Sequence, residues 1–533
     1  MRMKFAPSQV QKNFEAIGKS ASRDKLVKFV QDNFLAAGND LNLWDPPDWK
    51  EHPGFLKFIK DIEFKRFASE LNKLWKKLGR DIKSEARKGI NRSSLVVVEK
   101  PFIVPGGRFR EFYYWDSYWV VDGLLVCEMT NTVKGMIQNF VQMVREFGFV
   151  PNGGRIYYTN RSQPPFLIPI VELYLNATKD LDFVKGILEA LEMEYSFWVT
   201  QRSVTVEFKN REYNLSKYEA RMNQPRPESY YEDTETAKGL FPIEKAALHQ
   251  NLASAAESGW DFSTRWFNRS ESGTERSLRT TRTSEIIPVD LNSILYKNEQ
   301  ILERLFKIAN NSAKVVYYKN AAHARRTAIE AVMWDESRGL WLDYDLRFKE
   351  RTPGFFLSSV VPLWAGVHQG DASRERKIVA TLKKLKVLEF VGGVPTSLEN
   401  SGQQWDLPNA WPPLQHLLII GLAQSEDPEI QSEALKLSQK WVTNNYLAWK
   451  TTSKMFEKLN VTRKGAPGGG GEYDIQIGFG WSNGVVISLL SRYPKILRLE
   501  SSGPSGSGVS QVSMELMWFS LSLACYSIRT IKR

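Results

Sequence analysis

The sequence is poor in the residues on which several common enzyme classes depend. Its 533 residues include only two cysteines, Cys127 and Cys525, so at most one disulfide can form and a disulfide scaffold is excluded. The five histidines are scattered singly, without the His-x-x-x-His or Cys-x-x-Cys spacing of a zinc site. A metal centre or a histidine-dependent triad therefore lacks its parts. Carboxylate chemistry is the natural alternative.

The chain also lacks the composition of a disordered protein and the charge clustering of a nucleic-acid binder. Hydrophobic residues make up 42% and aromatic residues 12% of the sequence, enough to bury a large core. The net charge is +12 at pH 7, but Lys and Arg are spread along the chain and mixed with acids. We therefore interpret the charge as a basic, solvated surface and expect no nucleic-acid partner.

The N-terminal segment MRMKFAPSQVQKNF has no continuous apolar stretch of the kind found in a signal peptide. Seven Asn-x-Ser/Thr sequons are nevertheless present, and roughly half that number would be expected by chance. They begin at Asn91, Asn160, Asn176, Asn214, Asn268, Asn310 and Asn460. The excess favours a glycoprotein that is secreted or held on the extracellular face of the plasma membrane. In that case the signal lies outside this chain; otherwise the sequons are unused.

The C-terminal part of the chain changes composition twice. Residues 501–508 form a Ser/Gly/Pro-rich linker, and residues 509–533 are mostly apolar before a basic end. One interpretation is a last buried helix. The other is membrane attachment, through a short spanning helix or a cleaved lipid-anchor signal. Glu515 and the serines weaken the membrane interpretation, although the pattern leans towards an anchor.

Apolar residues recur at three-to-four spacing over most of the chain, and long alternating strand patterns are missing. This periodicity is typical of amphipathic helices. The predicted helices include Trp119–Phe147, Leu181–Trp198, Leu291–Met333, Leu414–Leu422 and Gln431–Leu447. Composition does not shift between residues 50 and 490 as it would at a linker. Residues 1–500 are therefore predicted to form one all-helical domain.

Trp-Asp pairs occur at residues 44, 115, 260, 334 and 405. Their spacing is close to multiples of about 72 residues, whereas propeller repeats are spaced at roughly 40–45 residues and are rich in strands. A helical hairpin repeated around a closed ring would fit this spacing. The sequences around the pairs are not alike, so an accidental spacing is the alternative.

The most informative segment is PGGRFREFYYWDSY, Pro105–Tyr118. It places a tight turn beside arginine, carboxylates and several aromatic rings. A sugar needs this combination, because its C–H face stacks on aromatic rings while its hydroxyls form charge-assisted hydrogen bonds. A second segment of similar character, QQWDLPNAWPP, covers Gln403–Pro413. Together the two segments predict a sugar-binding site.

Hydrolysis of a glycosidic bond usually needs two carboxyl groups, one to protonate the leaving oxygen and one to activate water or attack the sugar. Asp261 stands among bulky aromatic residues in GWDFSTRW. Burial against such residues raises a carboxyl pKa, which suits a proton donor; the alternative is a helix N-cap. Glu457, in KMFEKL, is less informative alone, because a Glu followed by Lys is typical of a solvated helix face.

Two further features have both a structural and a functional interpretation. The glycine run Pro467–Tyr473 is not a phosphate loop, since no Gly-Lys-Ser/Thr follows. It is either a flexible linker or a mobile loop that closes over a ligand. Arg108, Arg161 and Arg226 stand in unusual Pro- and aromatic-rich contexts. They form structural salt bridges or act as donor forks that bridge two sugar hydroxyls.

These segments, in this order, closely resemble the motifs of the trehalase family, and the resemblance extends from about residue 5 to about residue 490. It implies an all-α fold, a single (α/α)6 barrel of helical hairpins with long active-site loops. It also implies an inverting glycoside hydrolase that converts α,α-trehalose to two glucose molecules without a cofactor or metal. Asp261 would be the general acid and Glu457 the general base. The substrate-binding residues that the resemblance implies are Arg108, Phe109, Trp115, Asp116, Asn152, Arg161, Ser162, Gln163, Arg226, Glu228, Gly259, Trp411 and Glu472.

One position departs from the family pattern. Trehalases carry Met-x-Glu-Lys-Tyr where this chain has Leu459 in place of the Tyr. The departure leaves the carboxylate of Glu457 intact but puts its local support in question. The alternatives to a trehalase are a helical-barrel hydrolase for another α-glucoside, a sugar-binding protein that has lost turnover, and a nucleic-acid binder.

Overall fold

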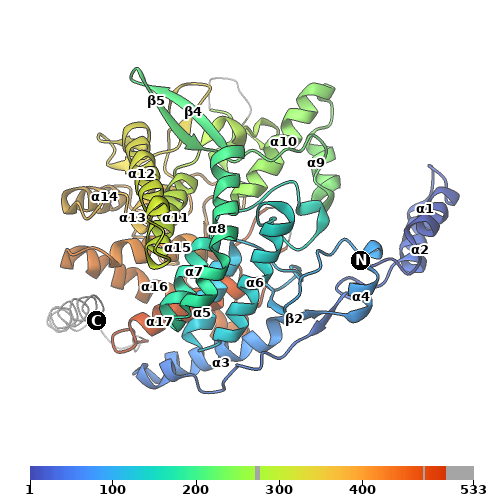
Figure 1. Ribbon diagram of the computed structural model, residues 1–533, viewed down its shortest axis with the longest axis horizontal. Helices are drawn as coiled ribbons and strands as arrows, with labels where there is room; N and C mark the ends of the chain where they lie inside the picture. The colour runs from blue at the N-terminus through green and yellow to red at the C-terminus, as the bar shows by residue number, and fades with distance from the viewer. Residues whose placement is uncertain (270–275, 472–473, 500–533) are drawn as a thin grey trace.

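The centre of the fold is a closed ring of six helices. The structure is a computed structural model that describes residues 1–269, 276–471 and 474–499 (Figure 1). The inner helices are α5 (Asp116–Val126), α7 (Leu167–Thr178), α11 (Val289–Ile308), α13 (Val361–Ala365), α15 (Pro412–Ala423) and α17 (Gly480–Arg492). Each inner helix packs against the next in this order, and α17 packs against α5 to close the ring.

An outer layer of helices surrounds this ring. Its members are α3 (Ile62–Leu78), α6 (Thr130–Phe147), α8 (Leu181–Gln201), α12 (Ser312–Ala328), α14 (Ala372–Lys384) and α16 (Pro428–Thr452). Outer and inner helices alternate along the chain, and most outer helices pack against an inner neighbour. The predicted all-α, single (α/α)6 barrel is confirmed.

The hydrophobic pattern explains which helices are inside. Nearly every residue of α15 is buried, because this helix is apolar all round. Its outer neighbour α16 buries one face and exposes the other. The crossing of α5 and α17 needs glycine on both helices: a Cβ on Gly123 would lie 2.6 Å from the Cα of Gly484. A Cβ on Gly484 would lie 1.9 Å from the carbonyl oxygen of Trp119, so neither position accepts a side chain.

The remaining helices and strands are not part of the two helical layers. The other α-helices are α1 (Pro7–Ala16), α2 (Arg23–Asn33), α4 (Ser84–Lys88), α9 (Tyr230–Thr236) and α10 (Pro242–Ser258). The strands are β1 (Leu41–Leu43), β2 (Gly79–Ile82), β3 (Phe102–Ile103), β4 (Ser203–Phe208), β5 (Arg211–Ser216), β6 (Ile286–Ile287), β7 (Trp334–Asp335), β8 (Leu340–Trp341), β9 (Tyr344–Asp345), β10 (Glu350–Arg351), β11 (Asn409–Ala410) and β12 (Leu459–Asn460). Figure 1 shows α1 and α2 on an arm at one side and the β4–β5 hairpin projecting from the barrel.

Two segments that were each predicted as one continuous helix contain two helices instead. The segment predicted as Trp119–Phe147 contains α5 and α6, which are separated at Glu128, a residue with φ of 64°. The Glu128 carboxylate accepts a hydrogen bond from the backbone of Gly54 at 2.7 Å, so a contact distant in sequence accompanies the break. The segment predicted as Leu291–Met333 likewise contains α11 and α12, which are separated at Asn310, with φ of 56°.

The Trp-Asp spacing is not a structural repeat. Trp115 immediately precedes an inner helix, whereas Trp334 lies in the short strand β7 that follows the outer helix α12. The pairs therefore occupy different places in the barrel. The alternative interpretation, an accidental spacing, is correct.

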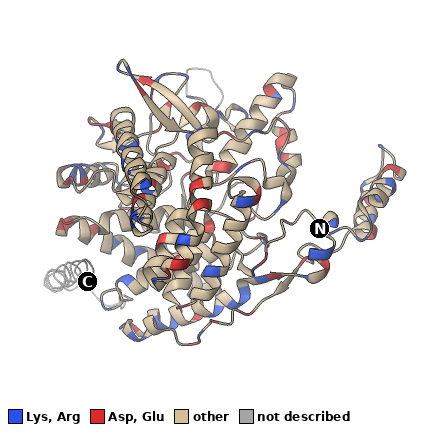
Figure 2. Ribbon diagram, in the orientation of Figure 1, with Lys and Arg blue, Asp and Glu red and all other residues tan. Residues whose placement is uncertain are grey.

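Charged residues are intermixed over the fold. Figure 2 shows Lys and Arg distributed over all parts of the chain drawn in colour, with Asp and Glu between them. One cluster of buried apolar side chains extends from Leu41 to Leu497. Within the described ranges, no helix combines the length and the apolar character that crossing a membrane requires. The predicted linker and C-terminal segment, residues 501–533, lie outside the described residues, so the domain division stays a prediction.

A buried hydrogen bond ties the loop before α5 to two helices. The hydroxyl of Tyr114 donates to Glu194 on α8 and accepts from the backbone N–H of Leu167 at 2.9 Å. Glu194 is fully buried, and this burial raises its pKa to about 8, although the hydrogen bond from Tyr114 opposes the shift. Glu194 is therefore a neutral carboxylic acid at and below neutral pH.

We predict that the protein loses stability between pH 5 and pH 8 and that Glu194→Gln removes part of this loss. In the unfolded chain Glu194 ionises near its ordinary pKa of 4.5, whereas the folded protein holds the proton up to about pH 8. The stability that this proton contributes is present below the lower pKa and is lost as pH rises through the higher one, by at most about 1.4 kcal/mol per pH unit. Thermal melts of both proteins across this range should show that, as pH rises, the melting temperature of the parent falls relative to that of the variant.

Glu189→Gln is the matched control, because Glu189 lies on the same helix but is exposed. Its melting temperature should follow that of the parent at every pH. Parallel curves of melting temperature against pH for Glu194→Gln and the parent would contradict the prediction, because they would mean that Glu194 has the same pKa in the folded and the unfolded chain.

Candidate active site

A cavity of about 300 Å³ lies where the loops that precede α5, α7, α9, α11, α15 and α17 meet. The side of the barrel that carries these loops is the one at which the inner helices begin. The predicted site residues that line the cavity are Arg108, Phe109, Trp115, Asp116, Asn152, Arg161, Gln163, Arg226, Glu228, Gly259, Asp261, Trp411 and Glu457. The fold thus brings together residues from six separate loops. Their individual roles stay predictions.

Two predicted residues are not among those that line the cavity. Ser162 is fully buried; its hydroxyl donates to the carbonyl of Val150 at 2.6 Å, and its N–H donates to Glu257 at 3.0 Å. It therefore holds the loop that carries Arg161 and Gln163. Glu472 lies outside the described residues, and its contact with the sugar stays a prediction.

Sequence reasoning missed several residues that line the cavity. They are Glu111, Tyr113, Tyr157, Tyr158, Ser229, Glu232, Ala256, Trp405, Phe479 and Trp481. Most of them stand inside or beside the segments already singled out, so the signal was present but not assigned to individual side chains. Tyr158, for example, lies before Arg161, and its hydroxyl lies 3.0 Å from that of Tyr113.

Stacked indole rings form one wall of the cavity. The rings of Trp405 and Trp411 are parallel, with centroids 3.9 Å apart, and Trp260 stacks on the other side of the group, 5.4 Å from Trp405. Trp115 and Trp481 pack against this stack from the loop before α5 and from α17. The wall lines the cavity with apolar ring atoms. The indole of Trp411 donates to the carbonyl of Gln404 at 2.8 Å, and that of Trp481 donates to the carbonyl of Glu457 at 2.9 Å.

Three carboxyl groups line the cavity within electrostatic reach of one another. Burial raises the pKa of Asp116 well above its ordinary value, and the charges of Glu457 and Asp261 raise it further. Burial is the largest cause of this shift, because it disfavours the charged form of the carboxyl group. In its protonated form Asp116 can donate a hydrogen bond to a ligand, whereas an ionised carboxylate can only accept.

A left-handed glycine directs the chain into the position of Asp261. Gly259 ends α10 with φ of 76°, and its missing side chain leaves room for Trp115: a Cβ here would lie 2.7 Å from the indole ring. The chain then turns so that Asp261 reaches the cavity half-buried. Asp261 is not a helix N-cap, because Ser263 takes that place before the short 3-10 helix Thr264–Trp266.

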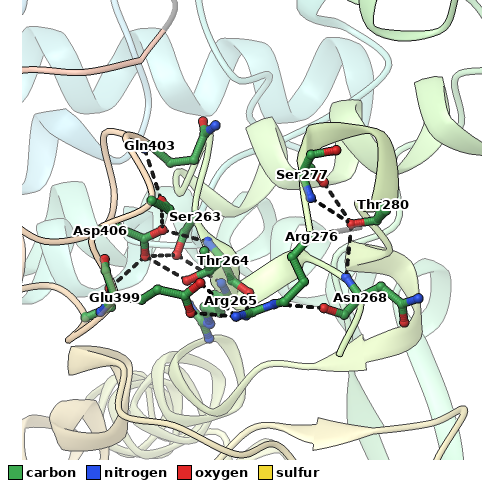
Figure 3. Close-up of polar contacts among 12 residues, drawn as sticks. Ser263, Thr264, Arg265, Asn268, Arg276, Ser277, Thr280, Glu399, Gln403 and Asp406 are labelled. Atoms are coloured by element: carbon green, nitrogen blue, oxygen red, sulfur yellow. Dashed lines mark hydrogen bonds and ion pairs between the residues drawn. The ribbon is translucent and has the colours of Figure 1, made fainter. Parts of the chain in front are cut away.

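The loop behind Asp261 is held by a buried carboxylate, Asp406 (Figure 3). Asp406 accepts hydrogen bonds from the hydroxyl of Ser263 and the N–H of Thr264, each at 2.8 Å, and from the hydroxyl of Ser397 at 2.7 Å. Burial raises its pKa, and these hydrogen bonds oppose the shift. The contacts join the loop of Asp261 to the segment that carries Trp405 and Trp411.

A buried arginine anchors the same loop to the barrel. The guanidinium of Arg265 forms ion pairs with Asp290 at 2.8 Å and Asp343 at 2.7 Å, and it lies between the rings of Trp260 and Trp266. Burial disfavours its charge, but the two carboxylates outweigh this effect and raise its pKa. Arg265 therefore stays charged and is part of the frame behind the cavity.

Glu457 lies in the connection between α16 and β12 and is only 2% exposed. The expectation of a solvated helix face was wrong for this residue. Its carboxylate forms an ion pair with Lys458 at 3.0 Å, and its carbonyl accepts from the indole of Trp481 at 2.9 Å. Leu459 is buried in the hydrophobic core and is not among the residues that line the cavity.

Two of the three arginines form ion pairs and also line the cavity. Arg161 pairs with Glu228 and donates to Asn152 at 2.8 Å, while its buried Nη1 has no hydrogen-bond partner among the described residues. Arg226 forms an ion pair with Asp233 at 2.7 Å. Arg108 is exposed at the rim, where its backbone N–H donates to the side chain of Gln476 at 2.7 Å.

The part of the chain that the structure describes contains no group of three or more His, Cys, Asp or Glu side chains placed to hold a metal ion. The expectation that no metal or cofactor takes part stays a prediction.

Comparisons with known proteins agree with the motifs. The family model described as trehalase matches residues 3–494. A trehalase from Apis mellifera is 46% identical over 509 residues, which cover 94% of this chain and 81% of that protein. A human trehalase is 44% identical over 497 residues, which cover 92% of this chain and 85% of that protein. The solved neutral trehalase of Saccharomyces cerevisiae is similar in fold, with a TM-score of 0.60 at 24% identity, covering 78% of this chain and 80% of the other.

We predict that Gly259→Ala destabilises the protein more than Gly148→Ala does. Both glycines end a helix with φ near 80°, but a Cβ at Gly148 meets nothing within 4 Å, whereas one at Gly259 strikes Trp115. Gly148→Ala should therefore cost about 1 kcal/mol of backbone strain. Gly259→Ala should add about 1–3 kcal/mol of overpacking.

Thermal melts measure both effects, and near-ultraviolet circular dichroism reports whether the indole of Trp115 has moved. Only Gly259→Ala should change the tryptophan signal. Equal destabilisation with unchanged spectra would contradict the proposed contact between residue 259 and the aromatic wall.

Proposed function

Because this chain belongs to the trehalase family and is an α,α-trehalase that hydrolyses trehalose to glucose, we propose that the reaction inverts one anomeric carbon. Asp261 acts as the general acid and Glu457 as the general base. The observation that supports this assignment most directly is that both carboxyl groups line one cavity, in which Glu457 is buried and Asp261 half-buried.

The mechanism follows from the two carboxyl groups and the water between them. Asp261 protonates the oxygen that bridges the two glucose units, while Glu457 removes a proton from a water molecule that attacks from the opposite face of the ring. The sugar that is attacked leaves as β-glucose and the other as α-glucose. In an inverting enzyme the two carboxyl groups are roughly 6.5–9.5 Å apart, so that the water fits between them.

The rest of the cavity holds the substrate in place. Trp405 and Trp411 give the glucose rings an apolar surface to pack against. Arg161 keeps one buried guanidinium nitrogen without a partner in the described part of the chain, and this nitrogen donates to a sugar hydroxyl. Asp116, whose pKa is raised by burial, donates to a second hydroxyl from its protonated form. Arg108, Gln163 and Arg226, which also line the cavity, complete the set of donors.

We predict that Asp261→Asn and Glu457→Gln each lower kcat/KM for trehalose by about 10²–10⁴-fold, because each removes one proton transfer from the transition state. The melting temperature of Asp261→Asn should change by no more than about 2 °C, because the substitution preserves side-chain shape. Glu457→Gln should lower it further, because the buried ammonium of Lys458 then lacks its carboxylate. The matched control is Glu232→Gln, since Glu232 is an exposed carboxylate at the same cavity. This substitution should lower kcat/KM for trehalose by less than about threefold.

The stereochemical half of the proposal needs early-time proton NMR of the parent enzyme with trehalose. Equal amounts of α- and β-glucose should appear before mutarotation mixes them. Two equivalents of α-glucose would instead indicate retention and would remove Glu457 from the role of base. Maltose and sucrose, run in parallel, test whether another α-glucoside is hydrolysed as well.

We also propose that the protein acts outside the cell and carries glycans. Four of its seven sequon asparagines are exposed: Asn91, Asn176, Asn214 and Asn310. Asn460 is not, because it lies buried in β12 and accepts hydrogen bonds from Thr462 at 2.8 and 2.7 Å. Peptide mapping of the secreted protein after glycan release in heavy-oxygen water should mark only exposed sites. Glycan at Asn460, or none anywhere, would contradict this proposal.

A further inference from the structure

The pair of carboxyl groups is connected by a buried lysine that the mechanism does not yet use. Lys458 is only 1% exposed. Its ammonium lies 3.0 Å from one oxygen of Glu457 and 3.1 Å from the side-chain oxygen of Gln404, and it sits 4.6 Å above the ring of Trp411. A buried ammonium is costly unless a negative charge and good acceptors surround it. Both conditions are met here.

The side-chain amide of Gln404 has one orientation that suits both of its neighbours. Its oxygen accepts from Lys458, which can only donate, and its nitrogen donates to the backbone carbonyl of Asp261, which can only accept. A flipped amide would set donor against donor and acceptor against acceptor. The main chain of Gln404 is fixed as well, because its carbonyl accepts from Trp411 at 2.8 Å and from Asn409 at 3.0 Å.

These contacts form a continuous connection from the backbone of Asp261 through Gln404 and Lys458 to the carboxylate of Glu457. We propose that Lys458 and Gln404 are positioning residues that set the place and orientation of Glu457 relative to Asp261, an inference that rests on the acid and base roles proposed above. The ammonium holds one carboxylate oxygen, which orients the other for the water that it deprotonates. A misplacement of about 1 Å can cost about 10²-fold in rate, so such a connection has a direct kinetic consequence.

The first test is Lys458→Met, which keeps an unbranched chain of similar length and removes the charge. We expect kcat for trehalose to fall by about 10–100-fold with KM changed by less than about threefold, because the lysine acts on the base and not on the sugar. Lys440→Met is the matched control. The ammonium of Lys440 is also partly buried and bonded, to the carbonyls of Leu388 and Phe390, but Lys440 does not line the cavity. Its kcat should stay within about twofold of the parent.

A double-mutant cycle separates a positioning role from a structural one. In a Glu457→Gln background, Lys458→Met should cause little further loss, since the carboxylate on which it acts is already gone. A lysine that merely stabilises the fold would lower the residual rate by the same factor in both backgrounds. Losses that multiply would therefore overturn the proposal.

Gln404→Met gives a second, independent variant should Lys458→Met not fold. It leaves the lysine in place and removes the link to Asp261, so kcat should again fall, by about tenfold, with little change in KM. The outcomes also distinguish this inference from the function beneath it. Near-normal turnover of Lys458→Met and Gln404→Met beside an inactive Glu457→Gln overturns the positioning role alone. Near-normal turnover of Glu457→Gln overturns the assignment of the base.

Discussion

The arrangement of the active site depends on the buried carboxylate of Asp406. Burying a charge without a cation is costly, and here hydroxyl and amide donors offset the cost. These donors come from the loop after Asp261 and from the segment around residue 397, so their hydrogen bonds to Asp406 hold the two segments together. A backbone hydrogen bond from Trp405 to the carbonyl of Phe262, at 3.0 Å, adds to the same junction. Because Gln404 precedes Trp405 directly, the junction also fixes the amide that reaches Asp261.

The arginines show that a structural and a functional interpretation of the same residue need not exclude each other. Arg161 and Arg226 are ion-paired as structural arginines are, yet both line the cavity. The ion pair removes the rotational freedom of a long side chain, so less entropy is lost when a ligand binds. Beside the pair with Glu228, the Nη1 of Arg161 has no hydrogen-bond partner among the described residues. In the proposed mode of binding, the carboxylate thus prepares the donor instead of competing with the sugar for it.

Much of the fold could be predicted from the sequence because the local spacing of apolar residues indicates where helices form. The inner helix α15 and the outer helix α16 were expected within a few residues of their observed bounds. The break at Asn310 has a local signal, since Asn tolerates a positive φ. The break at Glu128 has none, because Glu is a good helix former and its conformation is accompanied by a contact with Gly54, far away in sequence.

The same limit applies to the site. Asp261 could be singled out because the glycine and the aromatic residues that shape its surroundings are its sequence neighbours. Glu457 could not, since it is buried beside residues such as Trp481, which is not adjacent in the chain. Local reasoning placed it on a solvated helix, and the resemblance to a family supplied what periodicity lacked. Ser162 shows the reverse case, in which a residue inside a binding motif supports the loop from behind.

The position of Glu457 is set by the pairing of two short strands. In the antiparallel pair of β11 and β12, Ala410 lies opposite Leu459, so the next residues outward, Trp411 and Lys458, also face each other. This register explains why the ammonium of Lys458 lies over the ring of Trp411. A slip of one residue would turn every side chain to the opposite face and break both contacts. Backbone hydrogen bonds define the register, whereas the side chain at position 459 points into the core. Leucine in place of the family tyrosine therefore changes core packing and leaves the strand register, and with it the position of Glu457, unchanged.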